Sequence, residues 1–316
     1  MFLVLALLAP TFGADVRITR VDGTVRGAAL HHGQLYLWGS GIWKDKRLRG
    51  GDFGAGGCAY DVDGDRRADL ILQTGGKLVW LKGPSFRAAF TIDTEADFSD
   101  CLGTTLLGRR GVLVAHRGMQ VRFYQIPPDS AKPWPYREIY SFYTASYQSG
   151  LVLSDIDGDG LPDIVCGNYW IQSPKEFELP WRLFAINTYN EHPHSAHVRL
   201  AMLQGQRIVV SQGFAPQPVL ALFSPPLDRK QLWTERRIDI APSLQRPNAL
   251  LTLDGNDIVV GENVTGGRLL RLIGNGGKFS VETLTTGDAV QAVFADGPSR
   301  VYCVREHSVE MVRLPQ

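Results

Sequence analysis

The sequence predicts an all-β protein, a seven-bladed β-propeller built from four-stranded blades. A short apolar triplet, a turn with glycine and a β-branched run recur in this order along the whole chain. Each turn glycine marks one of the seven units: Gly33, Gly64, Gly108, Gly158, Gly205, Gly255 and Gly297. Their spacing of roughly 30 to 50 residues is the length of a four-stranded blade. The composition agrees, since 34 glycines and 18 prolines suit many short strands joined by tight turns.

Each unit divides into four runs that are typical of strands. The first run is the apolar triplet: Ala28–Leu30, Cys58–Tyr60, Thr104–Leu106, Val152–Leu153, Leu200–Met202, Leu250–Leu251 and Ala292–Phe294. The second is the β-branched run that follows the turn. The third tends to close with an aromatic or aliphatic residue and proline, as in Trp80–Pro84, Tyr124–Pro127, Trp170–Pro174 and Phe223–Pro225. The fourth opens with an aromatic and a polar residue, as in Phe86–Arg87, Tyr136–Arg137, Trp181–Arg182, Trp233–Thr234 and Phe279–Ser280.

The last unit lacks its fourth run, because the chain stops soon after Arg300–Val304 and Val309–Arg313. The N-terminal stretch Asp15–Arg20 has the composition of the missing strand. Pairing it as the outer strand of the last blade closes the ring and covers an exposed sheet edge. No linker rich in Ser, Gly or charge interrupts the repeats, so residues 14–316 are predicted to form one propeller domain.

Two of the turns are acidic and have the same spacing. The first contains Asp61, Asp63, Asp65 and Asp69, and the second contains Asp155, Asp157, Asp159 and Asp163. Four carboxylates so close together repel one another, so the folded loop needs a cation or full solvation. Asp at loop positions 1, 3, 5 and 9, with Gly allowing a sharp bend, can surround one Ca²⁺. The pattern predicts two structural calcium sites, with a solvated Asp-Gly hairpin turn as the alternative.

The units resemble FG-GAP or VCBS repeats. This family includes the calcium-binding propeller of integrin α subunits and many secreted bacterial propellers. The resemblance extends over residues 15 to 316, but only Asp61–Asp69 and Asp155–Asp163 match the acidic motif fully. The corresponding turns of the other five units are shorter, as in Gly33–Leu35, so we expect plain hairpins without metal there.

Charge and hydropathy give expectations for partners and location. With 33 basic and 32 acidic residues the net charge is +1, which argues against nucleic-acid and membrane-surface partners. Residues 1–13 hold a short apolar run before small residues, so we expect a signal peptide, although no basic residue precedes the run. A disordered or strand-forming N-terminus is the alternative. No later run is long enough to span a bilayer, and we expect a secreted or periplasmic monomer without membrane insertion.

The four cysteines follow no metal-binding spacing. Cys166 and Cys303 lie within apolar runs and are expected to be buried small hydrophobic residues. Cys58 and Cys101 precede two successive repeats at similar positions. A disulfide between neighbouring strands is one interpretation outside the cytoplasm, and two free thiols are the other.

Propeller geometry divides the loops between two faces. Turns between the first and second strands lie on one face, which we call the lower face, and both acidic loops are expected there. The turns between the second and third strands, and the segments that lead from one blade into the next, share the opposite, upper face, where the central channel opens. The candidate ligand-binding residues fall in upper-face segments: Arg26, His116, Tyr143, His192, His194, Asn248, Glu262, Arg305 and His307. Taken singly, each has a plainer interpretation as a cap, an ion-pair partner or packing between blades.

The longest blade entry, residues 187–197, contains a histidine cluster. His192, His194 and His197 have side chains that bind transition metals. The spacing fits a metal site, direct contacts to a ligand, or a solvated polar loop.

Two classes of function remain. The first is binding of a carbohydrate, or of an extracellular or envelope protein, at the upper face. The second is a polysaccharide lyase or related sugar-modifying enzyme, in which Arg246 neutralises a uronate and His197 or Tyr147 removes a proton. A purely structural module is a third interpretation, because the fold alone does not specify chemistry.

Overall fold

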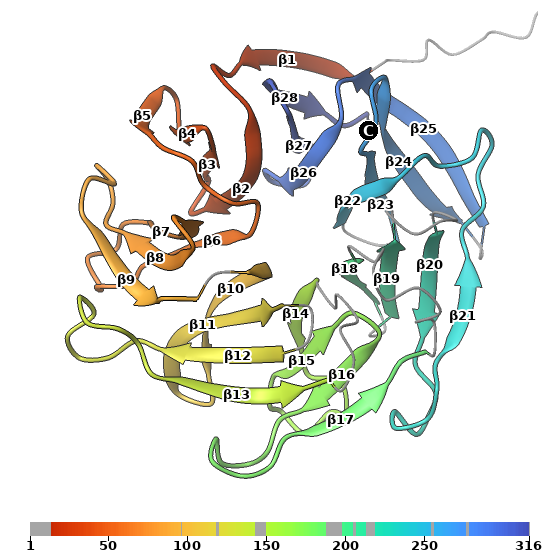
Figure 1. The fold of residues 1–316 in the computed structure, drawn as a ribbon. Coiled ribbons are helices and arrows are strands. Elements are labelled where there is room, and N and C mark those ends of the chain that lie inside the picture. Colours follow the sequence, from red (N-terminus) through yellow and green to blue (C-terminus); the bar gives the residue numbers. More distant parts are fainter. Residues whose placement is uncertain are drawn as a thin grey trace, which may run out of the picture.

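The computed structural model describes residues 14–95, 97–117, 120–142, 150–187, 198–204, 207–212, 219–253, 256–275 and 278–315. Within these residues the chain forms seven four-stranded antiparallel sheets arranged around a ring (Figure 1). The protein is a seven-bladed β-propeller, as the repeat predicts. The part that the structure describes contains no helix with the length and apolarity needed to cross a membrane.

Blades 1 to 4 follow the predicted order of four consecutive strands. Blade 1 contains β2 (Val25–His31), β3 (Gln34–Gly39), β4 (Gly41–Trp43) and β5 (Arg47–Gly50). Blade 2 contains β6 (Gly57–Tyr60), β7 (Asp69–Thr74), β8 (Lys77–Leu81) and β9 (Ala89–Asp93). Blade 3 contains β10 (Phe98–Leu106), β11 (Arg109–His116), β12 (Gln120–Gln125) and β13 (Tyr136–Ser141). Blade 4 contains β14 (Leu151–Ser154), β15 (Asp163–Cys166), β16 (Tyr169–Gln172) and β17 (Arg182–Ala185).

Blades 5 to 7 complete the ring. Blade 5 contains β18 (Val198–Leu203), β19 (Arg207–Gln212), β20 (Val219–Ser224) and β21 (Thr234–Arg237). Blade 6 contains β22 (Pro247–Thr252), β23 (Ile258–Glu262), β24 (Gly267–Asn275) and β25 (Lys278–Gly287). Blade 7 contains β26 (Val290–Ala295), β27 (Arg300–Arg305), β28 (Ser308–Arg313) and β1 (Asp15–Arg20).

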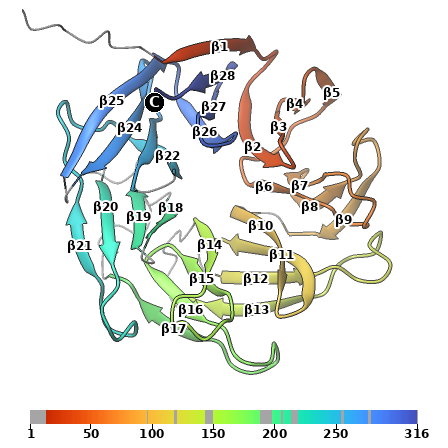
Figure 2. The same cartoon turned by 180° about the vertical axis from the view of Figure 1, so that it is seen from behind.

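The N-terminal strand closes the ring. β1 pairs antiparallel with β28, from Asp15 opposite Arg313 to Arg20 opposite Ser308. Both views show β1 lying along the outer side of blade 7, beside the last strand of the chain (Figures 1 and 2). The two ends of the propeller are therefore held by one sheet, which confirms the predicted closure.

The hydrophobic core lies between neighbouring blades. One cluster combines Trp38 and Ile42 of blade 1 with Leu70, Leu72 and Phe86 of blade 2. Blade-to-blade packing of this kind buries large aromatic side chains on sheets that are only four strands wide. The positions of loops on adjacent blades are consequently fixed relative to each other.

Tryptophan hydrogen bonds tie each blade with an acidic loop to the next blade. Trp80 of blade 2 and Trp134 of blade 3 donate to the same carbonyl oxygen, Ser130 O, at 2.8 and 3.0 Å. Trp170 of blade 4 and Trp233 of blade 5 donate in the same way to Arg229 O, at 3.2 and 3.3 Å. These shared carbonyls lie in loops between the third and fourth strands of their blades, on the same face as the acidic loops.

Cys58 and Cys101 form a disulfide between β6 and β10, the first strands of blades 2 and 3. The structure thus selects the bonded interpretation of these two residues. Cys166 and Cys303 are buried free thiols, as expected from their apolar runs.

We predict that the variant Cys58→Ser/Cys101→Ser is less stable than the wild type by about 3 kcal/mol, because the disulfide restricts the unfolded chain. Denaturant unfolding with and without reductant measures the difference. Reductant should lower the stability of the wild type to that of the variant and leave the variant unchanged. Equal stability of the two proteins under oxidising conditions would contradict the prediction.

Candidate functional site

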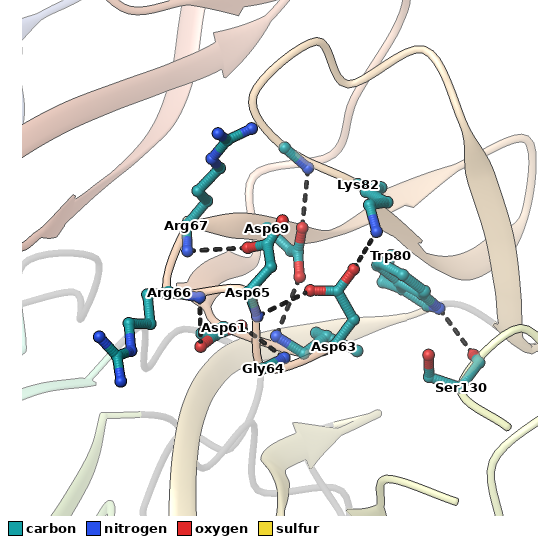
Figure 3. A network of polar contacts seen from close by, with 12 residues as sticks. Asp61, Asp63, Gly64, Asp65, Arg66, Arg67, Asp69, Trp80, Lys82 and Ser130 are labelled. Atoms are coloured by element: carbon teal, nitrogen blue, oxygen red, sulfur yellow. Dashed lines mark hydrogen bonds and ion pairs between the residues drawn. The ribbon is translucent and has the colours of Figure 1, made fainter. Parts of the chain in front are cut away.

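The first acidic loop connects β6 to β7 and brings three carboxylates together. Side-chain oxygens of Asp61, Asp63 and Asp65 lie within 4.8 Å of one another. The loop curls around these side chains because Asp61 accepts hydrogen bonds from Gly64 N (2.8 Å) and Arg66 N (3.0 Å). Figure 3 shows the three carboxylates gathered inside this curl.

The second acidic loop, between β14 and β15, repeats this arrangement. Asp155, Asp157 and Asp159 also place side-chain oxygens within 4.8 Å of one another. Asp155 accepts hydrogen bonds from Gly158 N (2.7 Å) and Gly160 N (3.0 Å), the counterparts of those at Asp61. Two copies with one geometry indicate that the loop shape follows from the shared aspartate and glycine spacing.

The donor chemistry of both loops fits a hard divalent cation. Three carboxylates at this separation repel one another, and a cation between them would relieve the repulsion. Ca²⁺ binds six to eight oxygen ligands, so three carboxylates would supply part of the shell and backbone carbonyls and water the remainder. The residues that would hold the cation are Asp61, Asp63 and Asp65 in one loop and Asp155, Asp157 and Asp159 in the other.

The ninth aspartate of each loop is placed differently. Asp69 is buried and accepts hydrogen bonds from Val62 N (2.9 Å) and Gly83 N (2.7 Å). Asp163 is buried too and accepts from Ile156 N (3.0 Å) and Ser173 N (2.8 Å). Burial raises the pKa of both carboxyl groups to about 6, against the opposing effect of these N–H groups. The structure therefore places Asp69 and Asp163 outside the two carboxylate clusters, where they fasten the loop to the end of the third strand.

One contact distinguishes the two clusters. Lys82 forms an ion pair with Asp63, whereas the neutral Gln172 donates to Asp157 at the same place in blade 4. Burial, the largest single effect, would raise the pKa of Asp63, but the hydrogen bond and the charge of Lys82 together with backbone N–H groups of the loop outweigh burial and hold that pKa below its usual value. A cation entering the first loop must compete with Lys82. The electrostatics of the second loop are therefore more favourable for binding a cation.

Two of the predicted upper-face residues are engaged within the framework. Glu262 is 2% exposed and accepts hydrogen bonds from Gln245 N (2.7 Å) and from the Arg268 guanidinium (2.6 and 2.8 Å). Arg305 is 1% exposed, and its Nε donates to Glu310 (2.8 Å) while Nη1 donates to Gly267 O (3.2 Å). Arg305 thereby joins blades 6 and 7.

Four other predicted residues lie on the upper face of blades 1, 6 and 7. Arg26 pairs with Asp52 at 2.6 Å, Asn248 donates to Gln291 O at 3.5 Å, and His307 Nδ1 lies 3.3 Å from Gly23 O. The Arg246 carbonyl accepts a hydrogen bond from Asn263 N at 3.0 Å. These residues come from blades 1, 6 and 7, which are neighbours in the ring, and each takes part in a contact within the framework.

His116 belongs to an ionic cluster at the entry to blade 3. Its ring is buried, with Nε2 3.7 Å from Glu95 Oε2. The same oxygen, Glu95 Oε2, lies 3.4 Å from Arg117 Nη2 and 3.6 Å from Arg122 Nη1. Burial lowers the pKa of His116, and the charges of Arg122 and Arg117 lower it further. The ring is therefore neutral at pH 7, and Glu95 is shared by the two arginines.

The remaining candidates lie outside the described residues. These are Tyr143, Tyr147, His192, His194 and His197. The histidine metal site and the proposed catalytic base both depend on them and stay predictions.

Comparison with known proteins supports the fold. No protein-family model matches the chain, and no curated protein matches it. Among solved structures, the chain resembles YCF48 from Cyanidioschyzon merolae with 10% identity and a TM-score of 0.58, covering 94% of this chain and 98% of that one. YCF48 bound to D1 peptide matches with 10% identity and a TM-score of 0.58, covering 95% of this chain and 97% of that one. The WD40 β-propeller domain of Doa1 matches with 11% identity and a TM-score of 0.62, covering 96% of this chain and 98% of that one.

The likeness is one of fold. Identities near 10% show a shared propeller architecture over almost the whole chain, and nothing about ligands. The resemblance to FG-GAP or VCBS repeats has no matching family model behind it and rests on the two acidic loops.

A cavity of about 410 Å³ lies between blades 1 and 2 on the lower face and was not expected from the sequence. It is lined by His31, His32, Gln34, Tyr36, Lys44, Leu48, Arg66, Arg67, Ala68 and Pro84. One signal was available, because Arg66 and Arg67 stand where the second acidic loop has Gly160 and Leu161. The other residues come from distant parts of the chain, and only the packing of blades brings them together.

Proposed function

We propose that this chain is an exported β-propeller, stabilised by calcium in its two lower-face loops, that binds a protein partner through its upper face. The repeated carboxylate clusters support calcium, since both offer the oxygen ligands that this cation prefers. The Cys58–Cys101 disulfide supports export, because such bonds persist in oxidising compartments.

The observation that carries partner binding is a group of exposed charges at the first blade entries. Arg26 and Asp52 have side chains 47% and 83% exposed, and Glu95 and Arg117 have side chains 45% and 52% exposed. Exposed charges of both signs, held by the rims of blades 1 to 3, offer electrostatic complementarity to a polypeptide. YCF48, a structure with the same fold, is described as bound to D1 peptide, which gives a precedent for peptide recognition by such a ring.

A peptide display library presented to the immobilised protein tests this proposal, with calcium in the buffer throughout. We expect selected peptides to bind saturably, and the variant Arg26→Glu/Arg117→Glu to lose at least about tenfold in affinity, as expected for loss of about 1.4 kcal/mol. The variant Lys132→Glu/Lys175→Glu carries the same charge change on lower-face loops and should bind like the wild type.

Two results would overturn the proposal that the upper face binds a protein partner. One is saturable binding on a glycan array with no selected peptide, which assigns the upper face to carbohydrate. The other is release of unsaturated, ultraviolet-absorbing ends from uronic-acid polymers, abolished by His197→Ala or Tyr147→Phe, which assigns a lyase.

A further inference from the structure

The cavity between blades 1 and 2 is lined by basic side chains and by no acidic one. Lys44 comes from the loop between β4 and β5, and Arg66 and Arg67 come from the first acidic loop. His31 is the last residue of β2, and His32 follows it in the turn to β3. A second cavity of about 730 Å³ adjoins it, since Gln34 and Lys44 line both. The positive charges thus belong to a hollow on the surface rather than to a convex edge.

The cations of this cavity are not held in ion pairs by the residues that the structure describes. In the residues that the structure describes, the side chains of Lys44, Arg66 and Arg67 form no ion pair, and Lys44 Nζ lies 6.0 Å above the Tyr36 ring. By contrast, Arg109 and Arg137 on blade 3 share Glu178 at 2.6 and 2.8 Å. Figure 3 shows both arginine side chains of the first acidic loop extending away from Lys82 and in different directions, Arg67 toward the top of the view and Arg66 toward the lower left.

One nearby acidic side chain is Asp61, whose negative charge acts on His31 but which forms no ion pair with the cations of the cavity among the described residues. Both of its oxygens accept backbone N–H groups within the loop, from Gly64 and Arg66. On the opposite wall, His31 Nε2 is buried without a hydrogen-bond partner among the described residues. Burial lowers the pKa of His31, so at pH 7 its ring offers a neutral polar group beside three permanent cations.

Two lining residues adopt backbone conformations that glycine would adopt more easily. Arg66 has φ 66°, where the second loop has Gly160 with φ 87°. His32 has φ 47° and immediately precedes Gly33. The conformation of His32 belongs to the hairpin turn, because Leu107 with φ 46° precedes Gly108 in the same way, so only Arg66 keeps a long side chain where the matching loop has glycine.

We propose that this cavity binds a tetrahedral oxyanion, a sulfate or phosphate group. Guanidinium groups donate paired hydrogen bonds to such oxygens, and a lysine ammonium adds charge from the adjacent blade. The adjoining cavity is lined by Arg20, Lys46 and Arg47 and also by Asp22 and Asp45, so its charge is mixed, and it leaves room for the molecule that bears the group. The second acidic loop, with Gly160 and Leu161, has the same backbone without these arginines and is not such a site.

Isothermal titration calorimetry tests the proposal with inorganic sulfate, inorganic phosphate, dextran sulfate and unsulfated dextran, all at one calcium concentration that is low enough to keep phosphate in solution. We expect one site per chain. The variant Arg66→Gly/Arg67→Leu adopts the sequence of the second loop, so it should fold, and its affinity should fall at least about tenfold. Lys44→Gln, on the other blade, should weaken binding as well.

The variant Lys77→Gln/Lys175→Gln removes two exposed charges elsewhere and should bind like the wild type. Tighter binding of dextran sulfate than of inorganic sulfate, with dextran inert, assigns the group to a polymer; the reverse assigns it to a free anion. No binding of any probe, unchanged affinity in Arg66→Gly/Arg67→Leu, or an equal loss in the control variant would overturn the site. None of these results bears on the upper-face peptide measurement, so the two proposals fail separately.

Discussion

Addition of Ca²⁺ to chelator-treated protein is expected to raise the midpoint of thermal unfolding by about 8 °C. A cation that binds only the folded state at a hundredfold excess over its Kd stabilises by about 2.7 kcal/mol, or about 5 kcal/mol for two independent sites. Dividing by the unfolding entropy of about 2.1 cal/mol/K per residue gives the temperature shift for a chain of 316 residues. Differential scanning calorimetry measures it.

Single-loop variants separate the two sites. Asp157→Asn removes a carboxylate from the second cluster, and Asp63→Asn removes its counterpart from the first; each should retain about half of the shift. The site left in Asp63→Asn should fill at lower calcium concentration, because Lys82 and the two arginines lie beside the first loop. Asp228→Asn changes an exposed aspartate of blade 5 and serves as the control. A melting curve that calcium leaves unchanged would refute both sites.

The fold could be predicted from the sequence because the repeated pattern is local and can be recognised without knowing which distant residues are in contact. Each predicted apolar triplet lies in the first strand of its blade, from Ala28–Leu30 in β2 to Ala292–Phe294 in β26. The incomplete last unit was enough to assign Asp15–Arg20 to blade 7, because an unpaired strand edge needs a partner.

The candidate sites followed from the sequence only where they are local. Spacing identified Asp61, Asp63 and Asp65 as neighbours, but it could not show that both oxygens of Asp69 accept backbone N–H groups. The basic cavity combines His31 at the end of β2, Lys44 of the loop between β4 and β5, and Arg66 of the first acidic loop. Packing of one blade on the next brings them together, and no periodicity within the chain encodes that contact.

The variant Glu262→Gln is expected to lower the free energy of unfolding by about 4 kcal/mol, because it leaves Arg268 without its charged partner. Glu262 is 2% exposed and accepts hydrogen bonds from Gln245 N and Arg268. The substitution therefore removes the negative charge of a buried ion pair, not of a solvated one. Denaturant unfolding at pH 7 measures the difference. Glu306→Gln, at an exposed carboxylate of blade 7, should change stability by less than about 0.5 kcal/mol.

The pH dependence of this variant distinguishes a structural ion pair from a ligand-binding carboxylate. Burial alone would raise the pKa of Glu262, but the hydrogen bonds from Arg268 and Gln245 N outweigh burial and hold it below the usual value of 4.5. A depressed pKa in the folded state contributes stability above the unfolded pKa, and this stability disappears as pH falls through the folded pKa. The advantage of the wild type over Glu262→Gln should therefore be constant near pH 7 and shrink below about pH 4.5. An advantage that persists at low pH, or equal stability at pH 7 with loss of peptide binding alone, would show that Glu262 serves a ligand instead of the framework.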